Sequence, residues 1–299
     1  MIRLLDSIKS KIDNTIKYVF LASDKLIFEV AYINKDDGKD ILCVSTHTAC
    51  TLGCKFCFTT EFKDKLKARE ITGDEITQAV SSIYEDLDLD NTKRLLLVSY
   101  MGCGEPTFNI PGVIGSARRI HKLYPNSRFA IATLMPKHNC RSFFEFTQAV
   151  IKYKLPIKVH FSLHFTENVI REDWMPAASK IKTSLVMLKF YQEATGNKVE
   201  LHYTLIEGAN DSYLNALELA SLLRPYKFPV KFIKHNVNDN NYIPLISDTV
   251  KMDMFQAILN ADNIFSEYYI PPGGDVGASC GQFLFNYYLK YNVKTKEET

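Results

Sequence analysis

The sequence CVSTHTACTLGCKFC, which runs from Cys43 to Cys57, decides how the rest of the chain is organised. Three of its cysteines have the spacing C-x3-C-x2-C: Cys50, Cys54 and Cys57. Three thiolates on one short loop can each bind one iron of a four-iron, four-sulfur cube, which leaves the fourth iron without a protein ligand. An open iron of this kind can chelate a small molecule that carries an amine and a carboxylate. The loop therefore predicts a 4Fe-4S cluster with one open coordination position.

A structural zinc site is the alternative interpretation of this loop. Zinc takes four ligands and usually draws them from paired C-x2-C spacings or from cysteine and histidine together. No second cysteine pair follows here, so the fourth ligand would have to be Cys43, His47 or the distant Cys280. The spacing favours the cluster and leaves zinc open.

Composition describes an ordinary globular chain. It has 299 residues, 46% hydrophobic and 23% charged, which is enough to bury a sizeable core. The net charge of +2 indicates no strong field for nucleic acid, although a local basic patch is compatible with it. No stretch has the form of a secretory signal or the length of a membrane span. The seven cysteines are odd in number and unevenly placed, which argues against a disulfide framework and predicts a cytoplasmic, reducing location.

The hydrophobic pattern predicts an α/β fold. Apolar residues at three- and four-residue steps predict an amphipathic helix over 1–17, and a β-hairpin is expected from strands over 17–22 and 25–33. From Ile41 onward strands and helices alternate, which predicts a parallel sheet with helices outside, in the form of a partial (β/α)6 barrel. We expect a single domain over 1–299, made of an N-terminal extension over 1–39, a barrel core over 40–271, and a C-terminal loop and tail over 272–299.

Two further motifs follow expected strands, where the reactive loops of such barrels lie. In the run MGCGEP, glycines let the backbone approach a ligand closely, and Glu105 can accept hydrogen bonds from an ammonium group. Ser162 and His164 share one face at the end of another strand and can bind ribose or carboxylate oxygens. A solvent-facing turn or a structural histidine would explain either motif alone. Beside the cysteine loop, the two motifs favour ligand binding.

Near the C-terminus, Cys280 lies in a stretch of small residues, GGDVGASCGQ, from Gly273 to Gln282. A thiol on such a loop suits a nucleophile that moves between two positions. A small cysteine packed in a turn is the structural alternative, and its position alone does not decide between them.

Taken together, these motifs resemble a known family. The C-x3-C-x2-C spacing with Phe56 before the third cysteine resembles the radical S-adenosylmethionine (SAM) superfamily, in which the cluster delivers one electron to SAM and yields a 5'-deoxyadenosyl radical. From about Lys17 to Phe283 the chain resembles the radical SAM adenosine methyltransferases of the RlmN and Cfr kind, which modify an adenine of ribosomal RNA and, for the RlmN type, of tRNA. The matching features are Cys43-Val44-Ser45, Met101 with Gly104-Glu105-Pro106 and Asn109, Ser162-Leu163-His164, Ile170-Arg171 with Pro176, Asn210-Asp211, Asn236, and Cys280-Gly281-Gln282.

The resemblance implies a methyl transfer that uses two SAM molecules. One SAM would methylate Cys280, and a second, cleaved at the cluster, would activate that methyl group for addition to an sp2 carbon. Cys43 would then form a disulfide with Cys280 and release the product. Glu29 falls near the family's proposed proton-accepting glutamate, with the outer face of the hairpin as its structural alternative. The implied cluster ligands are Cys50, Cys54 and Cys57, and the implied SAM-binding residues are Gly104, Glu105, Ser162, His164 and Asn236.

The departures from the family pattern fall on its RNA-facing side. The match begins at about Lys17, so we expect the accessory helical RNA-binding domain to be absent. A Ser-Thr-Ser-Gly run is replaced by ATLM over 132–135, and arginines before the last cysteine loop are replaced by YYIPP over 268–272.

The implied acceptor is an adenine in rRNA or tRNA, or a smaller heteroaromatic molecule. An electron donor such as flavodoxin or ferredoxin is an implied partner, and no membrane is involved. Two other functions stay open. One is a radical SAM enzyme that abstracts hydrogen directly from a small substrate, and the other is a non-enzymatic zinc- or RNA-binding module.

Overall fold

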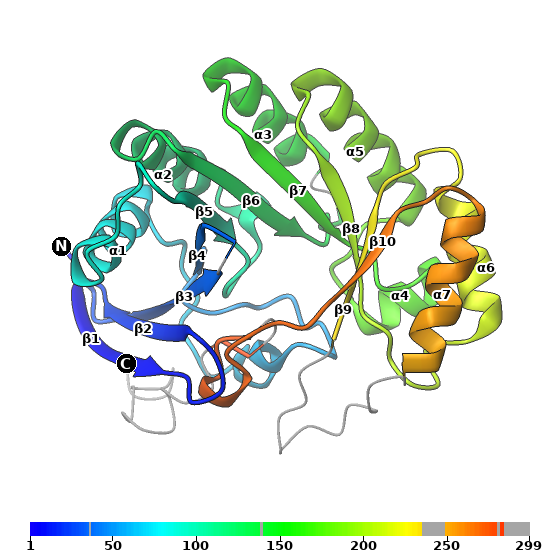
Figure 1. Ribbon diagram of the computed structural model, residues 1–299, viewed down its shortest axis with the longest axis horizontal. Coiled ribbons are helices and arrows are strands. Elements are labelled where there is room, and N and C mark those ends of the chain that lie inside the picture. The colour runs from blue at the N-terminus through cyan, green and yellow to red at the C-terminus, as the bar shows by residue number, and fades with distance from the viewer. Residues whose placement is uncertain (36, 138–139, 235–248, 280–281, 284–299) are drawn as a thin grey trace.

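One ten-stranded sheet organises the computed structural model, with its strands in chain order. The structure describes residues 1–299 except 36, 138–139, 235–248, 280–281 and 284–299 (Figure 1). The first four strands pair antiparallel, and every later strand is parallel to the one before it. The strands are β1 (Arg3–Lys9), β2 (Thr15–Leu21), β3 (Ile27–Lys35), β4 (Lys39–Val44), β5 (Leu95–Tyr100), β6 (Ser127–Thr133), β7 (Ile157–Ser162), β8 (Val199–Tyr203), β9 (Val230–Ile233) and β10 (Ser266–Tyr269).

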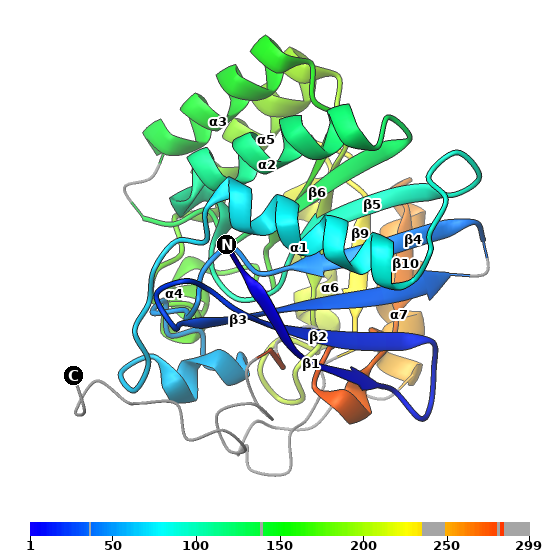
Figure 2. The ribbon, with the colours of Figure 1, turned by 90° about the vertical axis from the view of Figure 1, so that its left-hand side faces the viewer.

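Helices cover the outer face of the parallel part of the sheet (Figures 1 and 2). The longer ones are α1 (Gly73–Asp86), α2 (Ile110–Leu123), α3 (Cys140–Tyr153), α5 (Ile181–Thr195), α6 (Tyr213–Leu223) and α7 (Thr249–Ala261). The shorter ones are α4 (Asn168–Trp174) and the 3-10 turns η1 (Phe58–Phe62), η2 (Pro106–Phe108) and η3 (Gly274–Val276). The predicted α/β fold with a partial (β/α)6 barrel is confirmed. Within the described residues, the helices lack the combined length and apolar character that a membrane span needs.

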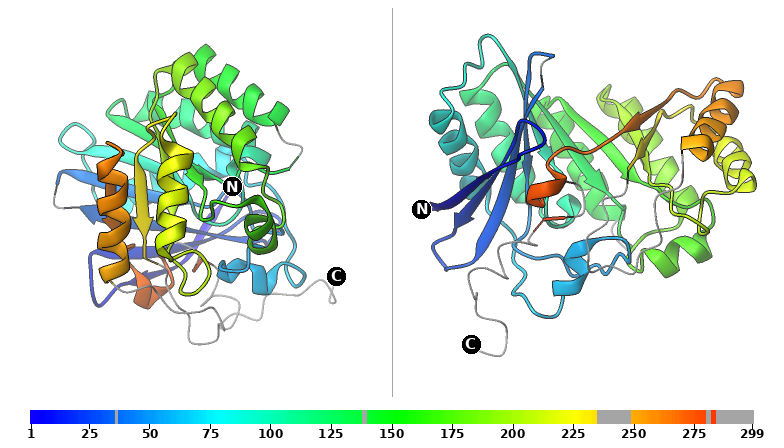
Figure 3. Two further views of the ribbon diagram at one scale, coloured as in Figure 1. Left: turned by 90° about the vertical axis from the view of Figure 1, so that its right-hand side faces the viewer. Right: turned by 60° about the horizontal axis from the view of Figure 1, so that its bottom comes forward.

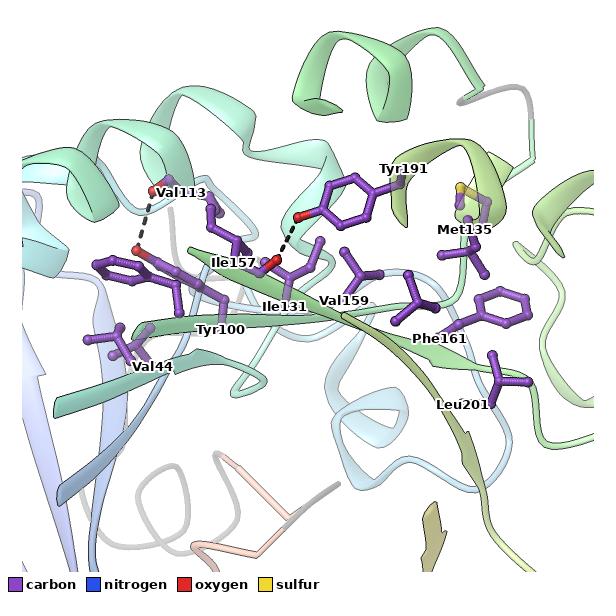
Figure 4. Packing of buried hydrophobic residues seen from close by; sticks show 14 of the residues in the cluster. Val44, Tyr100, Val113, Ile131, Met135, Ile157, Val159, Phe161, Tyr191 and Leu201 are labelled. Carbon is purple, nitrogen blue, oxygen red and sulfur yellow. Dashed lines mark hydrogen bonds between the residues drawn. The ribbon is translucent and has the colours of Figure 1, made fainter. Parts of the chain in front are cut away.

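The main core lies between the sheet and these helices, because the strands turn one apolar face outward and the helices turn an apolar stripe inward. Two buried tyrosines lock the layers together (Figure 4). The hydroxyl of Tyr100 on β5 donates to the Val113 carbonyl on α2 at 3.3 Å, and that of Tyr191 on α5 donates to the Ile157 carbonyl on β7 at 2.6 Å. Each tyrosine thus adds a buried aromatic ring to the core while its hydroxyl keeps a hydrogen-bond partner.

The helix predicted over 1–17 is wrong, because this segment forms β1, a turn and the start of β2. Asp13 accepts a hydrogen bond from the Thr15 N–H at 2.9 Å, and the Ser10 hydroxyl accepts one from the Asp13 N–H at 3.1 Å. These side chains favour a turn, and β2 then supplies backbone partners that override the helical spacing of the apolar residues. The predicted hairpin that follows is confirmed by β2 and β3.

The N-terminal strands also hold the segment that follows β10, which runs from that strand back to β2 (Figure 3). The Gly273 N–H donates to Asp13 Oδ2 at 2.7 Å. The Lys17 ammonium, buried on β2, donates to the Gly277 carbonyl at 3.1 Å. Residues from both ends of the chain therefore meet on the inner side of the barrel.

Candidate functional site

A cavity of about 190 Å³ brings most of the predicted site residues together. It lies beyond the carboxyl ends of the parallel strands, where the loops of such barrels converge. The site residues that line it are Cys50, Cys54, Cys57, Gly104, Glu105, Ser162 and His164. Loops that are far apart in the sequence thus form one chamber, as the sequence analysis expects.

The cysteine loop after β4 is a series of tight turns pinned to α4. The Cys57 N–H and the Thr60 hydroxyl both donate to the Cys54 carbonyl, at 3.0 and 2.7 Å. The Lys55 N–H donates to the Trp174 carbonyl at 2.9 Å. The three thiols of the motif form no disulfide, so they are available as ligands.

Burial disfavours the thiolate form of these three cysteines when no metal is bound. It raises the pKa of Cys50 to about 12, and it also raises the pKa values of Cys54 and Cys57, because a charged sulfur is disfavoured away from water. Bound metal reverses this preference, because a coordinating thiol is deprotonated by the ion. Iron–sulfur clusters take thiolate ligands, so this donor set fits such a cluster.

The spacing between the thiols separates a cluster from a single zinc ion. Sulfur ligands on one tetrahedral zinc lie about 3.8 Å apart, given a Zn–S bond of about 2.3 Å. In the described part of the chain, the group of His, Cys, Asp or Glu residues whose ligand atoms all lie within 4.8 Å of one another is His160, Glu200 and His202. At least one pair of the three thiols is therefore more than 4.8 Å apart, farther than two sulfur ligands of one zinc ion lie, and this separation fits ligands of different irons of a cluster.

Glu105 is a buried carboxylate in the wall of the cavity, 5% exposed. It accepts hydrogen bonds from the Thr107 N–H and hydroxyl at 3.1 and 2.7 Å, and from the Leu134 N–H at 3.1 Å. Burial raises the pKa of Glu105, while these donors oppose the rise. Beside it, Gly104 has a φ of +104°, and a Cβ there would lie 2.3 Å from His47 Nδ1. Only glycine lets this loop pass so close to the start of the cysteine loop.

His164 is held from several sides after β7. Its Nδ1 accepts a hydrogen bond from the Thr204 N–H at 3.1 Å, which places the proton of a neutral ring on Nε2. Its carbonyl accepts one from Asn210 Nδ2 at 2.6 Å. The ring packs edge-on against Phe56 of the cysteine loop, with centroids 4.9 Å apart. The aromatic residue of the motif thus joins the cysteine loop to a second wall of the cavity.

A second cavity, of about 700 Å³, lies in the interior of the barrel. Cys43 on β4 lines it, together with Ala278 and Ser279 from the C-terminal segment. Met101, His202 and Ile233 line both cavities, so they mark where the two chambers meet. Cys43 therefore lies deeper in the barrel than the cluster cysteines.

The remaining predicted residues fall outside these linings. Cys280 and Asn236 lie outside the described residues. Glu29 on β3 is wholly buried and pairs with Lys17 at 2.9 Å, so its interpretation as an outer-face residue is wrong. It is not among the described residues that line either cavity. The sequence predicts no role for His202, because it falls in the middle of the strand expected over 198–206; the structure ends that strand, β8, at Tyr203 and places His202 in the lining of both cavities.

Comparisons with known proteins place this site in a family. No protein-family model matches the chain. The "Probable dual-specificity RNA methyltransferase RlmN" of Thermotoga petrophila is 30% identical over 295 residues, which cover 94% of this chain and 79% of that protein. The chain belongs to the RlmN family of radical SAM methyltransferases.

Two further relatives agree with the RlmN assignment. The "Dual-specificity RNA methyltransferase RlmN" of Syntrophobacter fumaroxidans is 28% identical over 283 residues, covering 92% of this chain and 78% of its own length. The crystal structure of a radical SAM methyltransferase from Sphaerobacter thermophilus matches with a TM-score of 0.83 and 26% identity, over 95% of this chain and 81% of that one. Membership of the RlmN family implies SAM and a 4Fe-4S cluster, which the donor set of the smaller cavity fits.

Proposed function

We propose that this chain transfers a methyl-derived carbon through S-methyl-Cys280 to an sp2 carbon of adenine in RNA. The observation that carries the proposal is the arrangement of the two cavities. The three thiols of the cysteine loop line the smaller one with Glu105 and His164, and Cys43 lines the larger one. The RNA acceptor is taken from the relatives, which are named dual-specificity RNA methyltransferases. A smaller heteroaromatic molecule is the alternative acceptor.

In this proposal the walls of the smaller cavity hold the cluster and the amino-acid end of SAM. Cys50, Cys54 and Cys57 bind the 4Fe-4S cluster, and the Glu105 carboxylate accepts hydrogen bonds from the ammonium group of SAM. When bound, the cluster and SAM supply one-electron chemistry that activates a C–H bond beyond the reach of acids and bases. The residues proposed to bind SAM are Gly104, Glu105, Ser162, His164 and Asn236.

Two of the cysteines outside the cluster motif, Cys280 and Cys43, carry the covalent steps. Cys280 bears the methyl group, and the Cys43 thiolate attacks the Cys280 sulfur so that a disulfide forms as the bond to the product breaks. The electron pair of the broken carbon–sulfur bond leaves with the product carbon, which then takes up a proton. Support comes from Ala278, two residues before Cys280, which lines the same cavity as Cys43. Glu29 is proposed to accept the proton lost from the acceptor ring. Lys17 forms an ion pair with it at 2.9 Å.

The proposed cycle needs reducing partners. An electron donor such as flavodoxin or ferredoxin reduces the cluster, and the disulfide has to be reduced before the next turnover. RNA and low-potential donors favour the cytoplasm as the location. The continuous ten-stranded sheet supports the proposal that residues 1–299 work as one domain.

Mass spectrometry of anaerobically reconstituted protein given SAM tests the proposal. Cys280 should gain one methyl group, and Cys280→Ala protein should gain none. Cys43→Ala is the matched control, because it removes the resolving thiol and should leave methylation of Cys280 intact. An unmodified Cys280, in protein that still cleaves SAM, would overturn this route and favour direct hydrogen abstraction from substrate. Iron analysis should find about four irons per chain, and zinc in their place would indicate a non-enzymatic module.

A further inference from the structure

The larger cavity opens to solvent at the amino ends of the parallel strands, and basic side chains gather there. Arg128 near the start of β6 and Lys198 just before β8 both line the cavity and are exposed. The basic residues in its lining are Lys35, Lys39, Arg128, Lys158, Lys198 and Lys231, whereas the acidic residue in its lining is Asp37. This mouth is on the side of the barrel opposite the cysteine loop.

Part of this positive charge is not balanced by neighbouring carboxylates. Lys39 pairs with Asp37 at 2.6 Å. Arg128 donates to the Ser127 carbonyl at 2.9 Å, and neither Arg128 nor Lys198 pairs with a carboxylate within the described part of the chain. A cleft with a surplus of one charge attracts the opposite charge, and a guanidinium matches the geometry of a phosphate. The mouth therefore suits an anionic group.

Deeper inside, the wall becomes apolar before it reaches Cys43. Ile41, Leu97, Ala130 and Ile233 line this middle part. Such a surface suits the faces of a planar ring. The cavity volume of about 700 Å³ lies within the range of small-molecule sites, about 300 to 1,000 Å³.

Two buried imidazoles interrupt the apolar wall. His160 and His202 are 6% and 7% exposed, and their ring centroids lie 4.4 Å apart. His202 Nε2 makes no hydrogen bond to any described residue, with Glu200 Oε1 at 3.8 Å as its facing carboxylate atom. Burial lowers the pKa of His160 to about 4 and that of His202 below its usual value, so both rings are neutral near pH 7. A neutral imidazole offers one donor and one acceptor, which complements the edge of a nitrogen heterocycle.

The same cluster has the spacing of a metal site, since ligand atoms of His160, Glu200 and His202 lie within 4.8 Å of one another. The Lys158 and Lys231 ammonium groups, however, lie 2.7 and 2.9 Å from the Glu200 carboxylate and already neutralise it. A divalent cation would have to displace them in a chamber that is rich in basic groups. The cluster is better suited to a neutral ring edge than to a metal ion.

We propose that the larger cavity binds one nucleotide unit of the acceptor, with its phosphate at Arg128 and Lys198 and its base against His202, facing Cys43. The inference rests on the proposed function, because it places the base where the methyl-derived carbon would be delivered. The distance from the mouth of the cavity to Cys43 agrees with the length of a nucleotide. Lys39 at the mouth and Cys43 lie four residues apart on β4, which spans about 13 Å, comparable to the length of a nucleotide.

Calorimetric titration of anaerobic, cluster-loaded protein with adenosine 5'-monophosphate (AMP), without SAM, tests the inference. AMP should bind, and adenosine, which lacks the phosphate, should bind at least about tenfold more weakly. The double substitution Arg128→Ala/Lys198→Ala should weaken AMP binding by a similar factor and leave adenosine binding unchanged. His202→Gln should weaken both ligands. Lys122→Ala/Lys182→Ala is the matched control, because it removes the same charge from exposed sites on α2 and α5 and should leave AMP binding unchanged.

Absence of AMP binding, or equal AMP affinity in the double variant and its control, would overturn the inference. An RNA hairpin with an unpaired adenosine distinguishes the two sources of the nucleotide. Displacement of AMP by the hairpin would assign the unit to an RNA strand, and no displacement would assign it to a free nucleotide. AMP binding is measured without turnover, so protein that binds AMP as expected but leaves Cys280 unmethylated would count against the proposed function alone.

Discussion

Arg171 on α4 should control the stability of the whole smaller cavity. Its side chain is 1% exposed, and its guanidinium donates only to backbone carbonyls. The accepting carbonyls and their distances are Leu163 at 3.0 Å, Ser179 at 2.6 Å, Leu134 at 3.0 Å and Ser162 at 2.9 Å. Three of these residues lie at or just beyond the ends of β6 and β7. One buried cation therefore ties together the strand ends that carry the proposed SAM-binding loops.

The substitution Arg171→Met would leave four carbonyl oxygens without this donor. A buried polar group without a partner costs about 1 to 3 kcal/mol, so a simple sum gives about 4 to 12 kcal/mol. Two effects reduce it. The variant no longer buries a cation, whose desolvation lowers the pKa of Arg171 to about 10, and methionine keeps contact with the Phe161 ring over which the guanidinium lies. We expect a net loss of about 3 to 5 kcal/mol in the free energy of unfolding, near the lower end of that sum.

Guanidinium chloride denaturation of matched apoprotein samples would measure this loss. Arg141→Met is the control, because Arg141 is 90% exposed on α3 and such surface changes stay within about 0.5 kcal/mol. Arg171→Lys should fall between the two, since it keeps the charge but supplies fewer donors. A loss below about 1 kcal/mol for Arg171→Met would refute the argument that the guanidinium holds these strand ends.

Three further predictions concern the residues around the cavities. Gly104→Ala should lower the melting temperature, because φ is +104° and the new Cβ would lie 2.3 Å from His47 Nδ1; an unchanged melting curve would contradict this. Lys17→Met should cost about 3 to 5 kcal/mol in denaturation experiments by leaving Glu29 charged and buried, and Lys17→Met/Glu29→Gln should recover most of that loss. Burial raises the pKa of Glu105, so the folded state keeps this proton longer than the unfolded chain, and stability should fall as pH rises above the usual value of 4.5. The free energy of unfolding of Glu105→Gln should therefore rise relative to that of the wild type as pH increases above 4.5. A difference between the two proteins that stays constant with pH would be evidence against a raised pKa of Glu105.

The parts of the fold and site that could be predicted from the sequence depend on patterns of residues close together in the chain. The C-x3-C-x2-C loop and the loop with Gly104 each depend on neighbours in sequence, and strand–helix alternation alone places both at one edge of a parallel sheet. The helix prediction for residues 1–17 was wrong because it followed the helical spacing of the apolar residues. The interactions that determine the structure there are a turn and the pairing with a neighbouring strand.

Interactions between distant segments could not be predicted in this way. The Lys17–Glu29 pair depends on the register of β2 against β3, in which a shift of one residue would turn one side chain to the other face. The role of Arg171 depends on carbonyls from strand ends, and a carbonyl carries no sequence signal at all.

The buried pair explains why the N-terminal strands belong to the proposed active site. Lys17 binds Glu29 on β3 and also the Gly277 carbonyl of the C-terminal segment. Glu29 cancels the charge of the ammonium, so Lys17 can hold a backbone carbonyl in a buried site. Three residues of chain separate Gly277 from Cys280 and span at most about 11 Å between Cα atoms, so the hydrogen bond at Gly277 gives the proposed methyl carrier a short backbone tether. A cysteine that has to receive a methyl group, present it to a base and form a disulfide with Cys43 needs such a short tether. Loss of the Lys17 anchor should therefore slow disulfide formation more than it slows methylation of Cys280.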